Sequence, residues 1–172
     1  MVANTAISYE NSVHANADET QYLTFQLAGE QYGVDILKVQ EIRGHAEATT
    51  IPSAPGYVKG VINLRGSIVP IVDLRSRLNL PSSEAVDAPV AIIMTIERSG
   101  NNQLVGFVVD GVSDVLNIMN DNVRPVPHLG ELEHDKYLTG IARSNDELVL
   151  ILDTGLLFAD SELDALGQSD SP

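Results

Sequence analysis

Alternating apolar and polar residues recur along the chain in short runs separated by turn-forming residues. Leu23, Phe25 and Leu27 fall on one face of a predicted strand. A turn that contains Gly29 joins this strand to a second alternating run over residues 32–36. Two such runs across a short glycine-containing turn predict a β-hairpin, and order is expected to begin near Tyr22.

Three further hairpins follow from the same criteria. They cover residues 60–74 with a turn at 64–66, residues 90–112 with a turn at 99–102, and residues 137–153 with a turn at 144–146. Residues 36–43 fit either a strand or a helical turn. Many short strands with few helices predict an all-β barrel or sandwich.

Helices are expected at only two places. Asp73 is placed to cap a short helix over residues 74–80, and Asp153 or Thr154 could cap another over residues 155–167. Pro70 cannot donate a ladder hydrogen bond, so its strand should lie at an edge or be bulged there.

The same β pattern is present twice. The identical pairs are Tyr57/Tyr137, Gly60/Gly140, Val69/Val149, Ile71/Ile151 and Asp73/Asp153. A fainter match precedes each copy, in which Gly33 corresponds to Gly106 and Glu41 to Asp114. Any two hairpins with glycine turns look somewhat alike, which is the alternative interpretation. The repeat predicts two related β-modules packed side by side, with a boundary in the polar segment near residues 81–89.

Composition is compatible with one compact domain or two small subdomains in 172 residues. Hydrophobic residues make up 44% of the chain but aromatic residues only 5%, so the core should be aliphatic. The chain has no cysteine, which excludes disulfides and thiolate metal sites. No signal peptide or membrane-spanning run is recognised. Residues 1–20 and 167–172 are polar and aperiodic, and we expect them to be disordered tails.

The charge balance argues against nucleic acid and anionic membranes as partners. Ten basic residues stand against 24 acidic ones, a formal net charge of −14. Affinity for phosphates comes mainly from lysine and arginine. Part of the acidic charge lies in the predicted tails, where solubility is the simplest explanation.

Catalytic motifs are absent from the sequence: it contains no Walker loop, no GxSxG, no GxGxxG after a strand and no HExxH. His14 lies in the predicted tail. A metal site at His128 and His134 would need a fixed scaffold, and solvated loop histidines are the simpler interpretation. Asp110 and Asp114 could do acid–base work only if brought together and desolvated, so turn and capping roles are preferred.

Arg65 is a different kind of candidate. It lies in the predicted turn between two apolar strands, where its guanidinium would reach solvent or a partner. Its counterpart in the second copy is Asn145, so the repeat does not require an arginine there. A structural salt bridge is the alternative.

Long stretches of the chain resemble the CheW family of chemotaxis scaffolds. They are YGVDILKVQEIRG, IPSAPGYVKGVINLRGSIVPIVDLR, VGFVVDGVSDVL, VRPVP and YLTGIA, within residues 21–166. The resemblance implies two intertwined five-stranded Src-homology-3-like β-barrels with a shared hydrophobic junction. It also implies a non-enzymatic cytoplasmic adaptor without cofactors, which joins polar receptor arrays through the receptors.

By the same resemblance, one barrel contacts the regulatory domain of the histidine kinase CheA. The groove between the barrels receives the cytoplasmic tip of a chemoreceptor. The positions tied to receptor coupling match Val39, Glu41, Gly60 and Arg65, and less strongly Val90, Gly106, Val112 and Val115.

Three other classes remain as alternatives. They are a small-ligand-binding β-barrel sensor, a hydrolase using Asp110 and Asp114, and a fragment of a CheV-type adaptor or of a kinase. No kinase, phosphotransfer or receiver segment is recognised, so a stand-alone adaptor is favoured.

Overall fold

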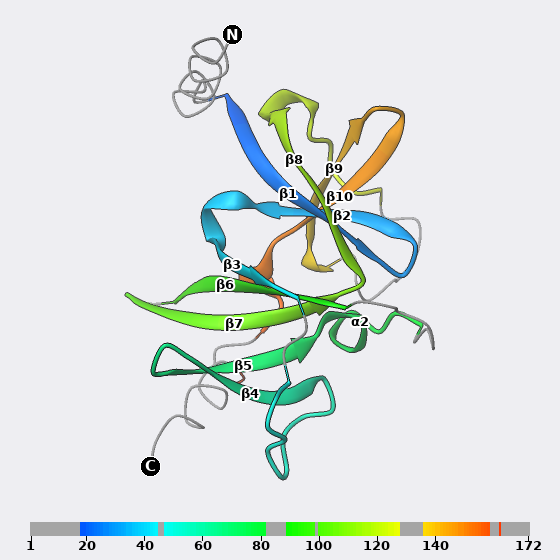
Figure 1. Ribbon diagram of the computed structural model, residues 1–172. Helices are drawn as coiled ribbons and strands as arrows, with labels where there is room; N and C mark the ends of the chain where they lie inside the picture. The colour runs from blue at the N-terminus through cyan, green and yellow to red at the C-terminus, as the bar shows by residue number, and fades with distance from the viewer. Residues whose placement is uncertain are drawn as a thin grey trace, which may run out of the picture.

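The protein consists of two five-stranded β-sheets (Figure 1). The structure is a computed structural model, which describes residues 18–44, 47–81, 89–98, 100–127, 136–158 and 162. The first contains β1 (Glu19–Leu27), β2 (Glu30–Asp35), β8 (Gly111–Met119), β9 (Leu138–Ser144) and β10 (Glu147–Leu152) in the order β8-β1-β2-β10-β9. The second contains β3 (Val39–Arg43), β4 (Val58–Leu64), β5 (Ser67–Asp73), β6 (Val90–Arg98) and β7 (Asn101–Val109) in the order β3-β6-β7-β5-β4. We call them the first and second barrel; the all-β prediction is confirmed.

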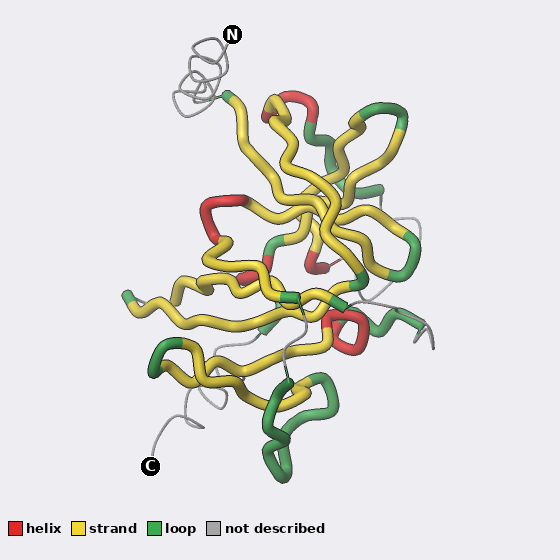
Figure 2. Tube along the Cα trace, viewed as in Figure 1, coloured by secondary structure: helices red, strands yellow, loops and turns green. Residues whose placement is uncertain are grey.

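Helical structure is confined to short pieces in the described part of the chain (Figure 2). The complete ones are α2 (Leu74–Arg77) and the 3₁₀ turns η1 (Ile36–Lys38), η2 (Asn120–Asn122) and η4 (Thr154–Leu156). The predicted caps are confirmed, because Asp73 accepts from the Arg75 N–H at 3.1 Å and Asp153 from the Gly155 N–H at 2.9 Å. The second predicted helix begins as a 3₁₀ turn, and Glu162 further along it is helical; residues 159–161 and 163–167 lie outside the described residues.

The two barrels exchange strands. The chain leaves the first barrel through η1 to form β3, which pairs with β6, and returns at Asp110 to form β8, which pairs with β1. The boundary predicted near residues 81–89 falls in sequence between α2 and β6, and residues 82–88 lie outside the described residues. Polar composition marks a loop but does not tell to which barrel the flanking strands belong.

The N-terminal limit also differs from the prediction. β1 begins at Glu19, and Thr20 pairs with Ile118, so the ladder starts inside the segment expected to be a tail. Residues 1–17 and 167–172 lie outside the described residues.

Strand register confirms the internal repeat. Gly60 lies opposite Ile71 as Gly140 lies opposite Ile151. The Asp73 N–H donates to the Tyr57 carbonyl at 2.7 Å, and Asp153 repeats this bond to Tyr137 at 2.9 Å. The fainter match between Gly33 and Gly106 is confirmed as well. Gly106 pairs with Ile71 in the parallel β5–β7 ladder, and Gly33 pairs with Ile151 in the parallel β10–β2 ladder.

Pro70 lies where β5 has a neighbour on one side. It pairs with Val61 of β4, whereas the parallel pairing with β7 begins one residue later, at Ile71. The missing N–H therefore removes no bond from the β5–β7 ladder. Pro70 is at a local edge, as predicted.

A single hydrophobic core runs through both barrels. It contains Phe25 and Tyr32 from the first barrel and Ile92 and Phe107 from the second, with Leu157, which directly follows η4. Each barrel also has a smaller interior cluster: Ile62, Leu64, Val69, Ile71 and Ile93 in the second, and Ile118, Ala142, Val149 and Ile151 in the first. Because the shared core needs residues from both, the barrels should fold as one unit.

Arg77 joins the barrels at their junction. Its guanidinium carbon lies 4.8 Å from the ring centre of Tyr57, 5.6 Å from that of Tyr137 and 5.4 Å from that of Phe158. The Tyr57 hydroxyl donates to Glu162 at 3.0 Å. Burial, and then this carboxylate, raises the pKa of Tyr57, so the hydroxyl keeps its proton and remains a donor.

Replacing Gly60 by alanine should destabilise the protein strongly. A Cβ there would overlap the carbonyl oxygen of Thr49, and φ is +148°. We expect a loss of about 3 kcal/mol or more, the upper end for a strained backbone position. Gly140→Ala would place a Cβ 2.9 Å from the Arg124 carbonyl oxygen and should also destabilise. Gly56→Ala meets nothing within 4 Å and is the control; equal urea midpoints for all three would contradict the prediction.

Candidate functional site

Glu41 and Arg65 come together on the second barrel. Arg65 Nη2 lies 2.8 Å from Glu41 Oε2, across the gap between β3 and the β4–β5 turn. Arg43 Nε lies 3.8 Å from the other Glu41 oxygen. The Arg65 side chain is 74% exposed and that of Glu41 26%. The cluster therefore presents two cations around one carboxylate at the surface.

The turn holds Arg65 in a conformation that arginine rarely adopts. Its φ is 51°, and that of Gly66 is 91°. The Gly66 N–H donates to the Asn63 side chain at 2.9 Å, which closes the turn. The counterpart Asn145 has the same φ of 51°, but asparagine tolerates this region better.

Stability alone does not explain an arginine at this position. The left-handed conformation costs about 1–2 kcal/mol for an ordinary residue. A surface ion pair contributes only about 0–1 kcal/mol. The pair with Glu41 therefore does not offset the strain, and a residue held this way motivates a functional hypothesis.

The other predicted site residues lie outside this cluster, and most of them are not exposed. Gly60 and Gly106 are buried, and a Cβ at Gly106 would lie 2.6 Å from Ile71 Cδ1. Val39, Val90 and Val112 pack against the shared core. Val115 is 45% exposed, but on β8 of the first barrel. The two glycines therefore act on the backbone, and the three valines on core packing.

Two residues of this part of the chain were not predicted as site residues. Arg43 follows Glu41 by two positions on β3, and the period of a strand would have placed both on one face. Leu37 is 83% exposed on η1, where its N–H donates to Asp35 at 2.9 Å. No sequence pattern distinguishes it from its apolar neighbours.

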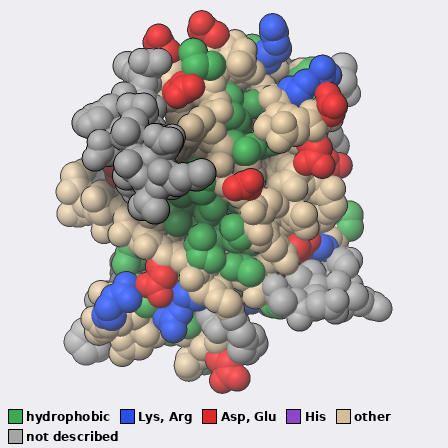
Figure 3. Space-filling model, turned by 45° about the horizontal axis from the view of Figure 1, so that its top comes forward, with side chains coloured by type: hydrophobic (Ala, Val, Ile, Leu, Met, Phe, Trp, Pro, Cys, Tyr) green, Lys and Arg blue, Asp and Glu red, His purple; other side chains and the backbone are tan. Residues whose placement is uncertain are grey.

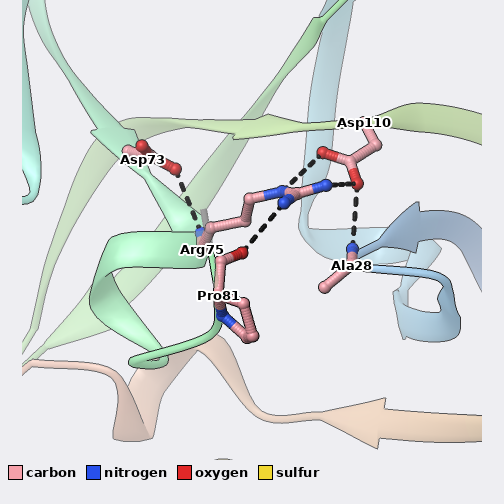
Figure 4. A network of polar contacts seen from close by, with 5 residues as sticks. All are labelled: Ala28, Asp73, Arg75, Pro81 and Asp110. Atoms are coloured by element: carbon pink, nitrogen blue, oxygen red, sulfur yellow. Dashed lines mark hydrogen bonds and ion pairs between the residues drawn. The ribbon is translucent and has the colours of Figure 1, made fainter. Parts of the chain in front are cut away.

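Asp110 has a structural partner (Figure 4). Its carboxylate accepts two hydrogen bonds from Arg75, one of them from Nε at 2.9 Å, and a third from the Ala28 N–H at 2.9 Å. Arg75 also donates to the Pro81 carbonyl at 2.9 Å. The network ties α2 of the second barrel to the β1–β2 turn of the first. Hydrogen bonding to Asp110 raises the pKa of Arg75, so the guanidinium keeps its charge.

Removing one member of this pair should destabilise the protein. Both side chains are mostly buried, and truncating Asp110 to alanine leaves the Arg75 charge without its partner. We expect a cost of about 3 kcal/mol. In a double-mutant cycle with Arg75→Met by urea unfolding, the double variant should lose less than the sum of the singles. Additive losses would mean that the two residues act independently.

The described geometry gives no support to a hydrolase that uses Asp110 and Asp114, or to a metal site. Asp110 turns to Arg75, whereas Asp114 lines a hollow elsewhere on the first barrel, so they do not face one cleft. Within the described ranges no three acidic or histidine side chains gather to hold a metal. His14, His45, His128 and His134 lie outside those ranges. Nor does any described helix have the length and apolarity to cross a membrane.

Apolar side chains are exposed on both barrels. Figure 3 shows hydrophobic side chains gathered near the middle of one face, with an acidic side chain beside them. The large apolar residues that remain exposed are Leu37, Ile42, Val115, Met119, Leu148 and Leu156. A hydrophobic patch of the kind visible in Figure 3 is suited to binding a protein.

Comparison with known proteins gives consistent matches. Residues 21–162 match the family model of the CheW-like domain. The chain is 39% identical over 143 residues to the chemotaxis protein CheW of Klebsiella aerogenes, covering 83% of this chain and 84% of that protein. It is 28% identical over 155 residues to the chemotaxis protein CheV3 of Helicobacter pylori, covering 84% of this chain but 49% of that protein. The crystal structure of the scaffolding protein TtCheW from Thermoanaerobacter tengcongensis superposes with a TM-score of 0.73 at 31% identity, covering 83% and 94% of the two chains. This match confirms the expected pair of Src-homology-3-like barrels.

Proposed function

The chain belongs to the family of CheW-like domains, non-enzymatic scaffolds of chemotaxis, and we propose that it couples chemoreceptors to the histidine kinase CheA by binding both. In this role it lies in the cytoplasm and joins the membrane arrays only through the receptors. Its work is to hold two proteins in a fixed relation, which needs no cofactor.

The conformation of Arg65 is the main observation that supports a receptor contact at this position. A strained, exposed guanidinium beside Glu41 offers charged hydrogen bonds at one defined place. The tip of a helical hairpin can bury its apolar side chains against an apolar surface, while these charges fix its register. Specificity then comes from the ion pair, and affinity from apolar contact.

Gly60, Gly106 and the three core valines would affect coupling through the shape of this surface. Val39 and Val90 lie on the paired strands β3 and β6, and Val112 is the first-barrel equivalent of Val39. Substitutions there would shift the backbone rather than remove a contact. Val115 is exposed and is proposed to touch the receptor directly.

Co-precipitation tests the adaptor function. The purified protein is mixed with the regulatory domain of CheA, with a receptor signalling fragment, and with both together. We expect each to bind alone and the three to form one complex, because the two partners use different faces. Binding of neither, or mutual exclusion of the two, would contradict the proposal.

A further inference from the structure

The internal repeat allows each interior residue of one barrel to be compared with its equivalent in the other. In the second barrel Ile93 lies opposite Gly106, and in the first Thr24 lies opposite Gly33. Ile93 and Thr24 are therefore equivalent. By the same registers Leu64 corresponds to Ser144, and Leu104 to Gln31.

These equivalent positions differ in one consistent direction. In the second barrel Leu64 and Ile93 are buried in the interior cluster, and Leu104 packs against it. The first barrel has a serine, a threonine and a glutamine at the same three places. One end of the first barrel is therefore polar and incompletely filled, where the second is apolar and packed.

A hollow of about 230 Å³ opens at that end of the first barrel. Thr24, Gln31 and Ser144 line it, together with Asp114, Asn145 and Glu147 at the ends of the strands. A cavity of about 150 Å³ can accept benzene, whereas pockets for drug-sized ligands start at about 300 Å³. The volume therefore suits one amino-acid side chain.

The rim of the hollow differs in charge from the equivalent rim of the second barrel. Asp114 corresponds to Glu41, which is paired with Arg65 and Arg43. In the first barrel those arginines are replaced by Asn145 and Leu116, and Glu147 adds a second carboxylate. Neither Asp114 nor Glu147 forms an ion pair with another part of the chain that the structure describes.

Other contacts hold the wall of the hollow in place. The Thr24 hydroxyl donates to the Asp114 carbonyl at 3.0 Å and accepts from the Asp114 N–H at 3.1 Å, at the bulge between β1 and β8. The Ser113 hydroxyl donates to the Gln31 side chain at 3.3 Å. Asp114 Oδ1 also accepts from the Val115 N–H at 2.8 Å, so the walls and this carboxylate are held in place. The second Asp114 oxygen and the Glu147 carboxylate form no ion pair within the described residues.

We propose that this hollow binds an arginine side chain presented by a partner protein. The apolar side chains of Leu116 and Val149 in the lining accept the methylene stem, and the hydroxyl, amide and carboxylate oxygens accept from the guanidinium. The net charge of −14 favours encounter with a basic segment. This site lies on the first barrel and does not depend on the receptor contact proposed for Arg65.

Titration with Nα-acetyl-arginine amide, followed by the backbone amide resonances of the whole protein, tests the site. This probe has a guanidinium but no α-amino or carboxylate charge, as in a polypeptide. We expect saturable shifts centred on Ser113, Asp114 and Asn145, and at least about tenfold weaker binding of the neutral citrulline analogue. Equal responses to both probes, or shifts that do not saturate, would overturn the proposal. Much tighter binding of free arginine would point to a metabolite instead and would also overturn it.

Two kinds of variant locate the effect. Gln31→Leu with Ser144→Leu copies the second barrel and should fill the hollow and abolish the saturable shifts. Glu147→Gln, at an exposed position, should weaken binding about tenfold without affecting the fold, whereas Asp121→Asn on η2 should leave it unchanged. Binding that persists in the filled variant would overturn the site. If the filled variant does not fold, equal affinities of Glu147→Gln and Asp121→Asn for the arginine probe would overturn the site.

Discussion

An aspartate at Val69 should unfold the whole protein and abolish the binding of both proposed partners. Val69 is 0% exposed inside the second barrel. An unpaired carboxylate buried there costs about 3–5 kcal/mol or more, against a total stability of about 5–15 kcal/mol for a typical domain. Circular dichroism and both affinities measure the effect.

The equivalent residue of the first barrel provides the matched test. Val149→Asp should unfold the protein in the same way, because both barrels contribute to one shared core. Leu148 is its neighbour in sequence but is 55% exposed, so Leu148→Asp should change stability by only about ±0.5 kcal/mol. A Val149→Asp variant that keeps the second barrel folded would show that the barrels are independent units.

A glutamate at Arg65 should abolish receptor binding and leave the fold intact. It removes the guanidinium and adds a like charge beside Glu41. Loss of one member of a contacting charge pair costs about 2–5 kcal/mol in binding, or roughly 30-fold to several thousand-fold in affinity. Folding stability should change little, because the side chain is exposed. Calorimetric titration with the receptor fragment measures the loss.

The control for this variant is charge reversal elsewhere on the surface. Arg143→Glu makes the same change on exposed β9 of the first barrel and should leave receptor affinity unaltered. Kinase affinity should be unchanged in both variants. A variant of Arg65 that melts like Val69→Asp, or that binds receptor normally, would mean that Arg65 is structural or idle.

Much of the local structure follows from the sequence alone. Strand faces, the hairpin turns and the caps at Asp73 and Asp153 depend on neighbouring residues, and alternation and turn chemistry report these directly. The equivalence of Gly60 and Gly140 also follows, because each is placed by the same bulged hairpin register.

The family resemblance implies intertwined barrels, but the exchange of strands does not follow from the residue pattern in the same way. Alternation fixes which face of a strand is buried but not which strand lies beside it, and β3 and β8 each pair outside their own half of the chain. The pairing of Arg43 with Glu41, and the polar hollow beside Ser144, likewise depend on register across strands. The pattern of residues along the chain does not reveal which strands pair or in which register.

The receptor affinity of Arg65→Asn tests the central claim most directly. Asparagine tolerates the left-handed turn, as Asn145 does, so the variant should fold at least as stably as the original protein. If Arg65 is retained for receptor contact, this equally or more stable variant should bind the receptor fragment at least about tenfold more weakly and bind CheA unchanged. Unaltered receptor affinity in the Arg65→Asn variant would contradict the account.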